Sequence, residues 1–523
     1  MIQFPRINGE EKQTAGKFFL PKELRVSRSD FAPWCLEAFC QRLALKEAEG
    51  QPWLILRTDK SLAPEGYRLC VTEQNVTVEA SAEQGVIWAL TTLYLRTEAD
   101  RRVACCLVED APRYVHRGQS LDCVRHFFPV EEVERILEQM SLVKMNVLHF
   151  HLTDDQGWRI ESKKFPQLQG VNAQYFTQEQ LKYLVGYARN RGIEIIPEVD
   201  LPGHTTAVLA AFPHLGCTGE RPRLAACGGI YTTILCAGKE AVYAFLEELL
   251  EELCGIFPSN RFHIGGDEAP KQQWMSCPDC AAAAKALGCE DFEQLQGHFT
   301  ERVVQILKKF GKTPVCWNET LKGLPAPEEM QVQYWTLDAP EKMDDYAKSG
   351  GTFIYSYMCE LYLDYPYSMT NVRKLYKMRP HIWNRPCGKD PGMLGLESTL
   401  WAEHICEPRD LEEHLFPRLY VVAEKAWSGG HGSYRECLAA LRQLCGLAEK
   451  AGVRTMPERW WNPRGKERRE EALAFFTKMN GGVLEEVPEN QAPAQMNLRL
   501  MFDYVVRFFR LSDLPALAKL YFH

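Results

Sequence analysis

The segment Arg261-Phe-His-Ile-Gly-Gly-Asp267-Glu268 joins an apolar run to two glycines and two adjacent carboxylates. A short apolar run bounded by glycines is typical of a buried strand, and glycines let the backbone approach a ligand closely. Two neighbouring carboxylates repel each other, which raises the pKa of at least one of them. A proton donor that works near neutral pH requires such a shift. A lone Asp-Glu pair is more often a strand end with two solvated acids, so the interpretation depends on the rest of the chain.

From about Tyr114 the chain alternates apolar, strand-like runs with helix-length amphipathic segments, such as Val130 to Leu142 and Lys239 to Cys254. This alternation predicts a parallel sheet. Eight strand–helix units over about 320 residues predict an α/β fold, a (β/α)8 TIM barrel with extended loops. The eight runs end near Cys123, Leu152, Val199, Gly265, Trp317, Trp335, Tyr357 and Trp401.

The pattern of apolar and polar residues differs on both sides of the predicted barrel. Residues 1–111 combine short strand-like pieces with a helix-like stretch near Gly85 to Arg96, which predicts an N-terminal α+β accessory domain. Residues 112–449 hold the predicted barrel. Residues 450–523 are rich in helix formers, and Gln491 to Leu520 is predicted to be helical, so we expect a helical C-terminal extension. Its aromatic residues, expected to pack rather than to bind a ligand, are Phe502, Tyr504, Phe508 and Phe509.

Bulk composition excludes several function classes. The balance of 61 basic and 69 acidic residues gives a net charge of −8, which argues against nucleic acid or an anionic membrane surface as the main partner. No window approaches 18 consecutive apolar residues, so no transmembrane helix is expected. The first residues lack a basic region followed by an apolar core, and 19 cysteines, an odd number, lack framework spacing. We therefore expect a reducing compartment and a cytoplasmic location.

Cys277-Pro-Asp-Cys280 has the spacing of a zinc or redox motif. No second pair lies at the distance of a zinc ribbon, and Cys289 is the nearest further thiol. The expectation from sequence is ordinary reduced thiols and no bound metal.

Polar and aromatic residues gather where the predicted strands end, which is where TIM barrels place their functional residues. Carboxylates and arginine hydrogen-bond hydroxyl groups, and tryptophan faces stack on sugar rings. A phosphate-binding glycine nest is missing, so the mixture favours a carbohydrate over a phosphate ester. These residues are Arg125, Asp154, Asp200, His204, Asp267 and Glu268 after strands one to four, and Trp317, Trp335, Tyr362, Asp364, Trp401 and Glu403 after strands five to eight.

Several spaced motifs carry a specific resemblance. They are Leu121-Asp-Cys-Val-Arg125, Leu148-His-Phe-His-Leu-Thr-Asp154-Asp-Gln-Gly-Trp-Arg159, Pro197-Glu-Val-Asp200-Leu-Pro-Gly-His204, His263-Ile-Gly-Gly-Asp267-Glu268, Val315-Cys-Trp317-Asn-Glu319, Tyr362-Leu-Asp364 and Leu400-Trp401-Ala-Glu403. On these motifs the chain resembles glycoside hydrolase family 20, the β-N-acetylhexosaminidases, from about Pro112 to Ser428.

The resemblance implies a retaining, substrate-assisted hydrolase, in which the sugar's own 2-acetamido oxygen attacks the anomeric carbon and an oxazolinium intermediate forms. Glu268 would be the general acid and then the general base. Asp267 would orient the acetamido group, and Tyr362 would hydrogen-bond its oxygen. Asp154 and His204 would form a relay that tunes Glu268.

The remaining matches imply a closed sugar pocket and exo action on one terminal N-acetylhexosamine of a glycan. Arg125 and Glu403 would bind hydroxyls at the non-reducing side, Asp364 a hydroxyl near Tyr362, and Asp200 would brace the wall. The walls would be Trp317, Trp335 and Trp401. No cofactor or metal is implied, and the choice between gluco and galacto sugars and the oligomeric state stay open.

One departure from the family pattern is visible. Members often carry Trp-Asp-Glu after strand five, where this chain has Trp317-Asn318-Glu319. Asparagine keeps the shape of aspartate and loses its charge, which removes any carboxylate role at position 318.

Two other function classes compete. His149-Phe-His151 places two imidazoles on one face of a strand, as in a metal-dependent hydrolase, although packing inside the barrel explains the same spacing. The other class is a sugar-binding protein without activity, which the presence of Asp267, Glu268 and Tyr362 disfavours.

Overall fold

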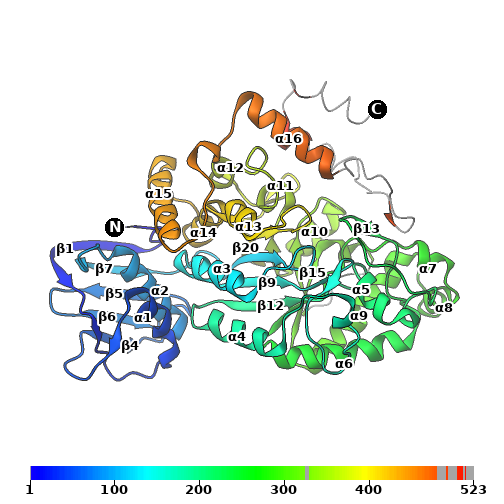
Figure 1. The fold of residues 1–523 in the computed structure, drawn as a ribbon, viewed down its shortest axis with the longest axis horizontal. Helices are drawn as coiled ribbons and strands as arrows, with labels where there is room; N and C mark the ends of the chain where they lie inside the picture. The colour runs from blue at the N-terminus through cyan, green and yellow to red at the C-terminus, as the bar shows by residue number, and fades with distance from the viewer. Residues whose placement is uncertain are drawn as a thin grey trace.

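The computed structural model describes residues 2–323, 325, 329–479, 491, 492, 503, 505–509 and 513. A sheet domain formed by the N-terminal residues lies beside a larger barrel, and later helices cover one end of that barrel (Figure 1). Among the described residues, no helix combines the length and the apolarity that crossing a bilayer requires.

The N-terminal domain is a five-stranded sheet in the order β1-β7-β5-β6-β4, with helices on one face. Residues of β5 and β6 alternate between buried and half-buried, as expected where one face of a sheet packs and the other meets solvent. The strands and helix predicted here are confirmed. The elements are β1 (Glu10–Phe19), β2 (Glu23–Leu24), η1 (Pro33–Leu36), α1 (Glu37–Leu43), β3 (Lys46–Glu47), β4 (Leu54–Thr58), β5 (Tyr67–Val71), β6 (Val76–Ala80), α2 (Glu83–Arg96) and β7 (Arg102–Asp110).

α2 is wedged between this sheet and the barrel, which explains why nearly all of its residues are buried. Trp88 on α2 contacts the edge of Trp427 in the barrel domain, with ring centroids 6.3 Å apart. Glu65 accepts hydrogen bonds from the Trp88 indole at 2.8 Å and from the buried guanidinium of Arg117 at 2.5 Å. These contacts fix the accessory domain against the barrel.

Eight parallel strands close into a barrel, so the predicted (β/α)8 fold is confirmed. The ring closes because β20 pairs with β8 over six residue pairs from Gly395↔His116 to Leu400↔Leu121. Each strand ends within two residues of its predicted end. In ring order from the first, the strands are β8 (His116–Asp122), β9 (Val147–His151), β12 (Glu194–Glu198), β14 (Arg261–His263), β15 (Thr313–Trp317), β16 (Gln331–Tyr334), β17 (Phe353–Tyr355) and β20 (Met393–Leu400).

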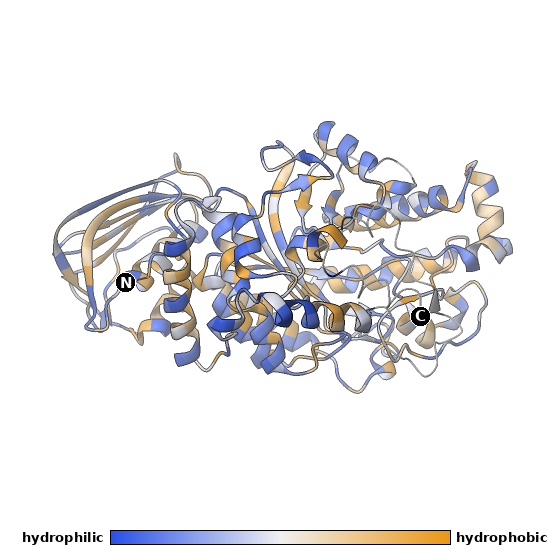
Figure 2. Ribbon diagram, turned by 90° about the horizontal axis from the view of Figure 1, so that it is seen from above, coloured by the Kyte–Doolittle hydropathy of each residue, from blue (hydrophilic) through white to orange (hydrophobic). Residues whose placement is uncertain are grey.

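Amphipathic helices surround the barrel, and Figure 2 shows hydrophobic and hydrophilic residues alternating along them. α3 (Val130–Leu142) buries Val133, Ile136, Leu137 and Met140, the spacing of one helical face. Both helical segments named from sequence are confirmed. The other helices are α4 (Gln178–Arg189), α5 (Thr206–Ala211), α6 (Glu240–Ile256), α7 (Gln272–Ser276), α8 (Pro278–Leu287), α9 (Phe292–Lys309), α10 (Pro340–Lys348), α11 (Met358–Leu361), α12 (Val372–Lys377), α13 (Pro408–Leu415) and α14 (Arg418–Ser428).

The C-terminal part begins with α15 (Tyr434–Lys450), whose capping box at Ser433 satisfies its first N–H groups, and continues to α16 (Gly465–Met479). The helical prediction for Gln491 to Leu520 is wrong at its start, because Gln491–Ala492 forms β21 and pairs with β13 (Ile230–Tyr231). Backbone pairing with a distant loop there outweighs local helix propensity.

Asp503 and residues 505–508 are helical, Phe509 is not, and Asp513 lies in a 3-10 turn. Apart from these and Gln491–Ala492, that predicted helix lies outside the described residues. Phe508 and Phe509 are buried, as predicted, against Tyr365 and Phe476. Phe502 and Tyr504 lie outside the described residues. The domain limits at 111 and 449 stay predictions.

Candidate active site

The loop after β14 makes the turn that presents both carboxylates of the opening motif. Gly265 and Gly266 adopt φ angles of +63° and +100°, which only glycine adopts without strain. The Gly266 N–H donates to Asp200 Oδ1 at 3.1 Å, and a Cβ on Gly265 would lie 1.7 Å from the same oxygen. The two glycines are therefore required so that Asp200, from the loop after β12, can brace the turn. Asp200 supports the site from below, as its predicted bracing role requires.

Two non-glycine residues of the site also have positive φ: His204 at +52° and Glu268 at +44°. Such backbone conformations are costly and persist where surrounding contacts hold them. The Glu268 N–H donates to Glu319 Oε2 at 3.1 Å, and Lys322 holds the other Glu319 oxygen at 2.8 Å. Glu319 was not among the predicted site residues. Its position beside Trp317-Asn318 was visible in the sequence, but nothing there shows that it binds a backbone N–H of another loop.

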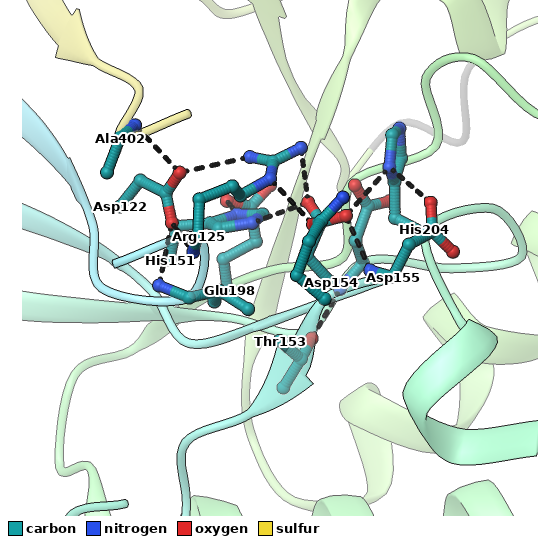
Figure 3. A network of polar contacts seen from close by, with 12 residues as sticks. Asp122, Arg125, His151, Thr153, Asp154, Asp155, Glu198, His204 and Ala402 are labelled. Atoms are coloured by element: carbon teal, nitrogen blue, oxygen red, sulfur yellow. Dashed lines mark hydrogen bonds and ion pairs between the residues drawn. The ribbon is translucent and has the colours of Figure 1, made fainter. Parts of the chain in front are cut away.

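His204 lies between two pairs of carboxylates, and Figure 3 shows the first of them, Asp154 and Asp155. Its Nδ1 is 3.1 Å from Asp154 Oδ1 and 3.3 Å from Asp155 Oδ2. Its Nε2 is 3.7 Å from Glu268 Oε2 and 3.9 Å from Asp267 Oδ2. The predicted Asp154–His204 hydrogen bond is present, and His204 Nε2 faces Glu268 without a hydrogen bond to it. Asp155 is an additional partner that sequence analysis missed.

Arg125 joins this relay to the outer rim of the site (Figure 3). Its guanidinium contacts Asp154 at 2.7 Å and Asp122 at 3.2 Å, and lies 3.8 Å from Glu403. It also stands 5.3 Å from the ring centre of Trp401. Arg125 and Glu403, predicted to bind sugar hydroxyls together, are thus neighbours.

Four aromatic rings from different strand ends form one group. Trp317 contacts Trp335 and Trp401 at centroid distances of 6.5 and 6.1 Å, and Tyr362 contacts the same two rings at 6.3 and 6.2 Å. Trp335 and Trp401 are half-buried, whereas Trp317 is 1% exposed and donates its indole N–H to Glu198 at 3.0 Å. Trp317 therefore forms the floor of this aromatic group, and Trp335 and Trp401 keep part of their surface free.

Several polar atoms in this region are buried without a hydrogen-bond partner among the described residues. They include Asp267 Oδ1, Trp335 Nε1 and Asp364 Oδ1. Buried polar atoms in folded proteins are nearly always paired, so a cluster of unpaired ones indicates a place where a ligand supplies the partners. All three belong to residues predicted for the site.

Protonation equilibria in the site are strongly shifted. Burial, reinforced by the charges of Asp267 and Glu319, raises the pKa of Glu268 to about 8. Burial and the charge of Asp200 raise the pKa of Asp267 well above its usual range, and burial raises the pKa of Asp200 to about 7. His204 stays protonated, because the surrounding carboxylates outweigh the effect of burial on its pKa. Glu268 therefore holds a proton at neutral pH, and its side chain keeps 32% of its surface exposed.

The hydrogen bonds of Asn318 explain why this chain carries asparagine at this position. Its amide donates to the carbonyl oxygens of Thr336 and Asp338 at 3.2 and 3.3 Å, and its oxygen accepts from the Trp335 N–H at 2.9 Å. An aspartate could not donate these hydrogen bonds. Asn318 thus positions the loop that carries Trp335.

The histidines considered as metal ligands are paired with carboxylates inside the barrel. His149 contacts Glu397 at 2.8 Å and Glu198 at 3.2 Å, and His151 contacts Glu198 at 2.5 Å and Asp154 at 2.9 Å. These contacts support the packing interpretation of the His149-Phe-His151 spacing. His151 and Glu198 also extend the relay downward from Asp154, which sequence analysis did not predict.

Known proteins are similar to this chain in both sequence and three-dimensional structure. The model of "Glycosyl hydrolase family 20, catalytic domain" matches residues 114–430, and "Glycosyl hydrolase family 20, domain 2" matches residues 13–111. A beta-hexosaminidase from Porphyromonas gingivalis is 32% identical over 398 residues, 70% of this chain and 51% of that protein. The chain thus spans about half the length of this curated relative.

Two solved structures extend the comparison. A β-N-acetylhexosaminidase from Bacteroides fragilis has a TM-score of 0.79 and 27% identity, covering 87% of this chain and 97% of its own. An exo-β-N-acetylglucosaminidase from Vibrio harveyi, solved with N-acetylglucosamine, has a TM-score of 0.77 and 27% identity, covering 87% and 78%. With matching models across the accessory domain and the barrel, this chain belongs to glycosyl hydrolase family 20.

Proposed function

We propose that this chain is an exo-acting, retaining β-N-acetylhexosaminidase. It removes a terminal β-linked N-acetylglucosamine or N-acetylgalactosamine from a glycan, with the substrate's acetamido group as nucleophile. The observation that carries this proposal is a proton-holding, accessible Glu268 next to Asp267, whose Oδ1 has no partner among the described residues, close to the group of four aromatic rings.

In the first step the acetamido oxygen forms a bond to the anomeric carbon while the bond to the leaving oxygen breaks. Glu268 transfers its proton to that oxygen, which its pKa of about 8 permits at neutral pH. In the second step Glu268 takes a proton from a water that attacks the anomeric carbon, and the acetamido group is restored. Two displacements at one carbon retain its configuration.

Asp267 and Tyr362 hold the nucleophile in line. The acetamido N–H donates to Asp267 Oδ1, and this hydrogen bond favours the ionised carboxylate that the positive intermediate requires. Tyr362 lies near enough for the charges of Asp267 and Glu268 to affect its pKa, and its hydroxyl donates to the acetamido oxygen. The rings of Trp335 and Trp401 enclose the acetamido methyl.

The long loop after β12 packs against Glu403, and this contact supports exo action. Gly228, in the long loop after β12, packs so close to Glu403 that a Cβ there would lie 2.7 Å from Glu403 Cγ. Arg125, Glu403 and Asp364 bind the hydroxyls of the terminal sugar on this side of the site.

The decisive experiment compares the nitrophenyl β-N-acetylglucosaminide with the plain β-glucoside. The two substrates differ only in the 2-acetamido group. Cleavage of the first alone is expected. Equal cleavage of both would show a protein nucleophile and contradict the mechanism, and binding of the amino sugar without turnover would favour the inactive sugar-binding alternative. A cytoplasmic location also stays a proposal, which cell fractionation tests.

A further inference from the structure

Four cysteine thiols meet in one cluster away from the catalytic carboxylates. The sulfurs of Cys217, Cys236, Cys277 and Cys280 all lie within 4.8 Å of one another. Cys236 Sγ is 3.4 Å from Cys280 Sγ and 3.8 Å from Cys277 Sγ, and Cys217 Sγ is 3.8 Å from Cys280 Sγ. Three of the four are buried, and Cys217 is half-buried.

These distances match a metal tetrathiolate. A zinc ion with four sulfurs at about 2.3 Å in a tetrahedron separates neighbouring sulfurs by about 3.8 Å. A disulfide would bring two sulfurs to about 2.05 Å and leave the other two outside the bond. The four sulfurs are spaced more evenly than in two disulfides. They also lie closer together than packing alone would require.

The backbone around the cluster favours thiolates. The Gly238 N–H donates to the sulfurs of Cys236 and Cys280, as backbone N–H groups do to metal-bound thiolates. A Cβ on Gly238 would lie 2.2 Å from the carbonyl carbon of Asp279, so only glycine allows this approach. Cys277 is the N-cap of α8, whose N-terminal dipole stabilises negative charge.

Four thiolates and one divalent ion would together carry negative charge. The ammonium of Lys239, near Cys217, offsets part of this charge. The ammonium of Lys239 donates to the carbonyl of Gly216 at 2.5 Å, directly before Cys217, and to the carbonyl of His214 at 3.0 Å. This lysine is fixed to the same loop as two of the four thiols.

The cluster joins the two loops that carry the relay. Cys217 and Cys236 belong to the loop after β12, which also holds His204, and Cys277 and Cys280 follow Glu268 in the loop after β14. Between them, the Trp274 indole donates to the carbonyl of Leu235 at 2.8 Å. A metal here would lock the separation of these loops.

We propose that Cys217, Cys236, Cys277 and Cys280 bind one Zn²⁺ in a closed structural site that ties the loop after β12 to the loop after β14. Four protein ligands leave no position for water or substrate, so the ion takes no part in hydrolysis. Zinc binding converts the four thiols to thiolates, and their protons pass to solvent. This proposal departs from the expectation of ordinary reduced thiols, which rested on the lack of a second cysteine pair at ribbon distance in the sequence.

The first test is metal analysis of the full chain, expressed with zinc and purified without chelator. About one zinc ion per chain is expected, and it should resist gel filtration. Cys236→Ser and Cys280→Ser should lose the zinc, whereas the matched variants Cys289→Ser and Cys254→Ser should retain it. Cobalt replacing the zinc should give the visible bands of a tetrahedral thiolate site, a readout that needs no variant to fold.

Three results would overturn the proposal. They are a zinc-supplemented wild-type protein without metal, an intact mass lower by two or four hydrogens because of disulfides among these cysteines, and a red protein loaded with iron. Removing zinc with a strong chelator should lower the Tm, and adding zinc back should restore it. None of these readouts uses glycoside cleavage, so failure of the proposed function would leave this test intact.

Discussion

Two layers of carboxylates and histidines lie one above the other in the barrel, and they behave in opposite ways. In the lower layer, inside the barrel, Glu397 contacts His116 at 2.7 Å and His149 at 2.8 Å, and Glu198 contacts His263 at 2.8 Å. In the upper layer, at the strand ends, Asp267 and Glu268 lie 3.9 and 3.7 Å from His204.

This difference in pairing reverses the pKa shifts. Both layers are at least half-buried, which by itself raises the pKa of a carboxyl group. In the lower layer the histidines outweigh burial and hold the pKa of Glu198 and Glu397 well below the usual range. In the upper layer burial prevails, and the pKa of Glu268 rises to about 8. The same residue types thus build an ionised scaffold below and a protonated acid above.

The largest expected effect comes from removing the upper proton donor. Glu268→Gln should lower kcat about 10²- to 10⁴-fold, the usual contribution of general acid catalysis. The loss should be greater for a β-linked disaccharide than for a nitrophenyl glycoside, because nitrophenolate leaves without protonation. Glu301→Gln, a half-buried residue of α9 outside the site, serves as the control. An equal loss with both leaving groups would contradict the general-acid role.

Breaking the lower layer should affect stability instead. Glu397→Gln removes one of the two carboxylate partners of charged His149, and should cost about 3–5 kcal/mol of unfolding free energy, measured by denaturant titration. The Glu397 contribution is lost as pH falls below the unfolded value of about 4.3, because its folded pKa is lowered. Glu240→Gln, in an exposed pair with Arg302, should change stability little. A stable but inactive Glu397→Gln protein would show that the two layers are not separable.

Asp267→Asn tests the carboxylate that faces the intermediate. Losing its charge should lower kcat about 10²- to 10³-fold, the scale of one removed transition-state contact, with a smaller change in KM. Stability should stay the same or rise, because Asp267 Oδ1 has no partner among the described residues. Unchanged kinetics would exclude the assigned role.

Asn318→Asp restores the residue that relatives often carry and should still be harmful here. Its new oxygen would face the carbonyls of Thr336 and Asp338, which the amide now satisfies, at a cost of about 1–3 kcal/mol. A lower melting temperature and a higher KM would both show that the loop carrying Trp335 is disturbed. A more active variant of equal stability would place position 318 in contact with substrate.

The smallest effect is the alkaline limb of the pH profile. In the proposed mechanism protonated Glu268 is the active form, so kcat/KM should fall about tenfold per unit as the pH rises above its pKa of about 8. A limb centred near pH 4 to 5 would mean that burial does not raise this pKa. The residual activity of Glu268→Gln should lack the limb.

Strand positions were predictable from sequence because a parallel barrel buries both faces of each strand, which leaves continuous apolar runs. The runs predicted to end near Leu152 and Val199 end at His151 and Glu198 in the structure. Local propensity failed at Gln491–Ala492, where pairing with β13 decides the conformation. Pairing between segments far apart in the chain leaves no local pattern.

The residue types of the catalytic site were also set by sequence. Asp267, Glu268, Tyr362 and Arg125 were identified because motifs place them at strand ends. The residues that position these side chains were not identified from the sequence. Glu319 and Asp155 act through contacts with Glu268 and His204, 51 and 49 positions away along the chain.

By itself, the sequence determined the barrel and the chemistry available at its mouth, because hydrophobic periodicity and motif spacing are local properties of the chain. Only the tertiary structure decided which acids are paired and which hold a proton, since a pKa depends on distances between loops. It also decided that Cys217 and Cys236 join the Cys277–Cys280 pair. Folding, rather than spacing along the chain, brings those four sulfurs within reach of one ion.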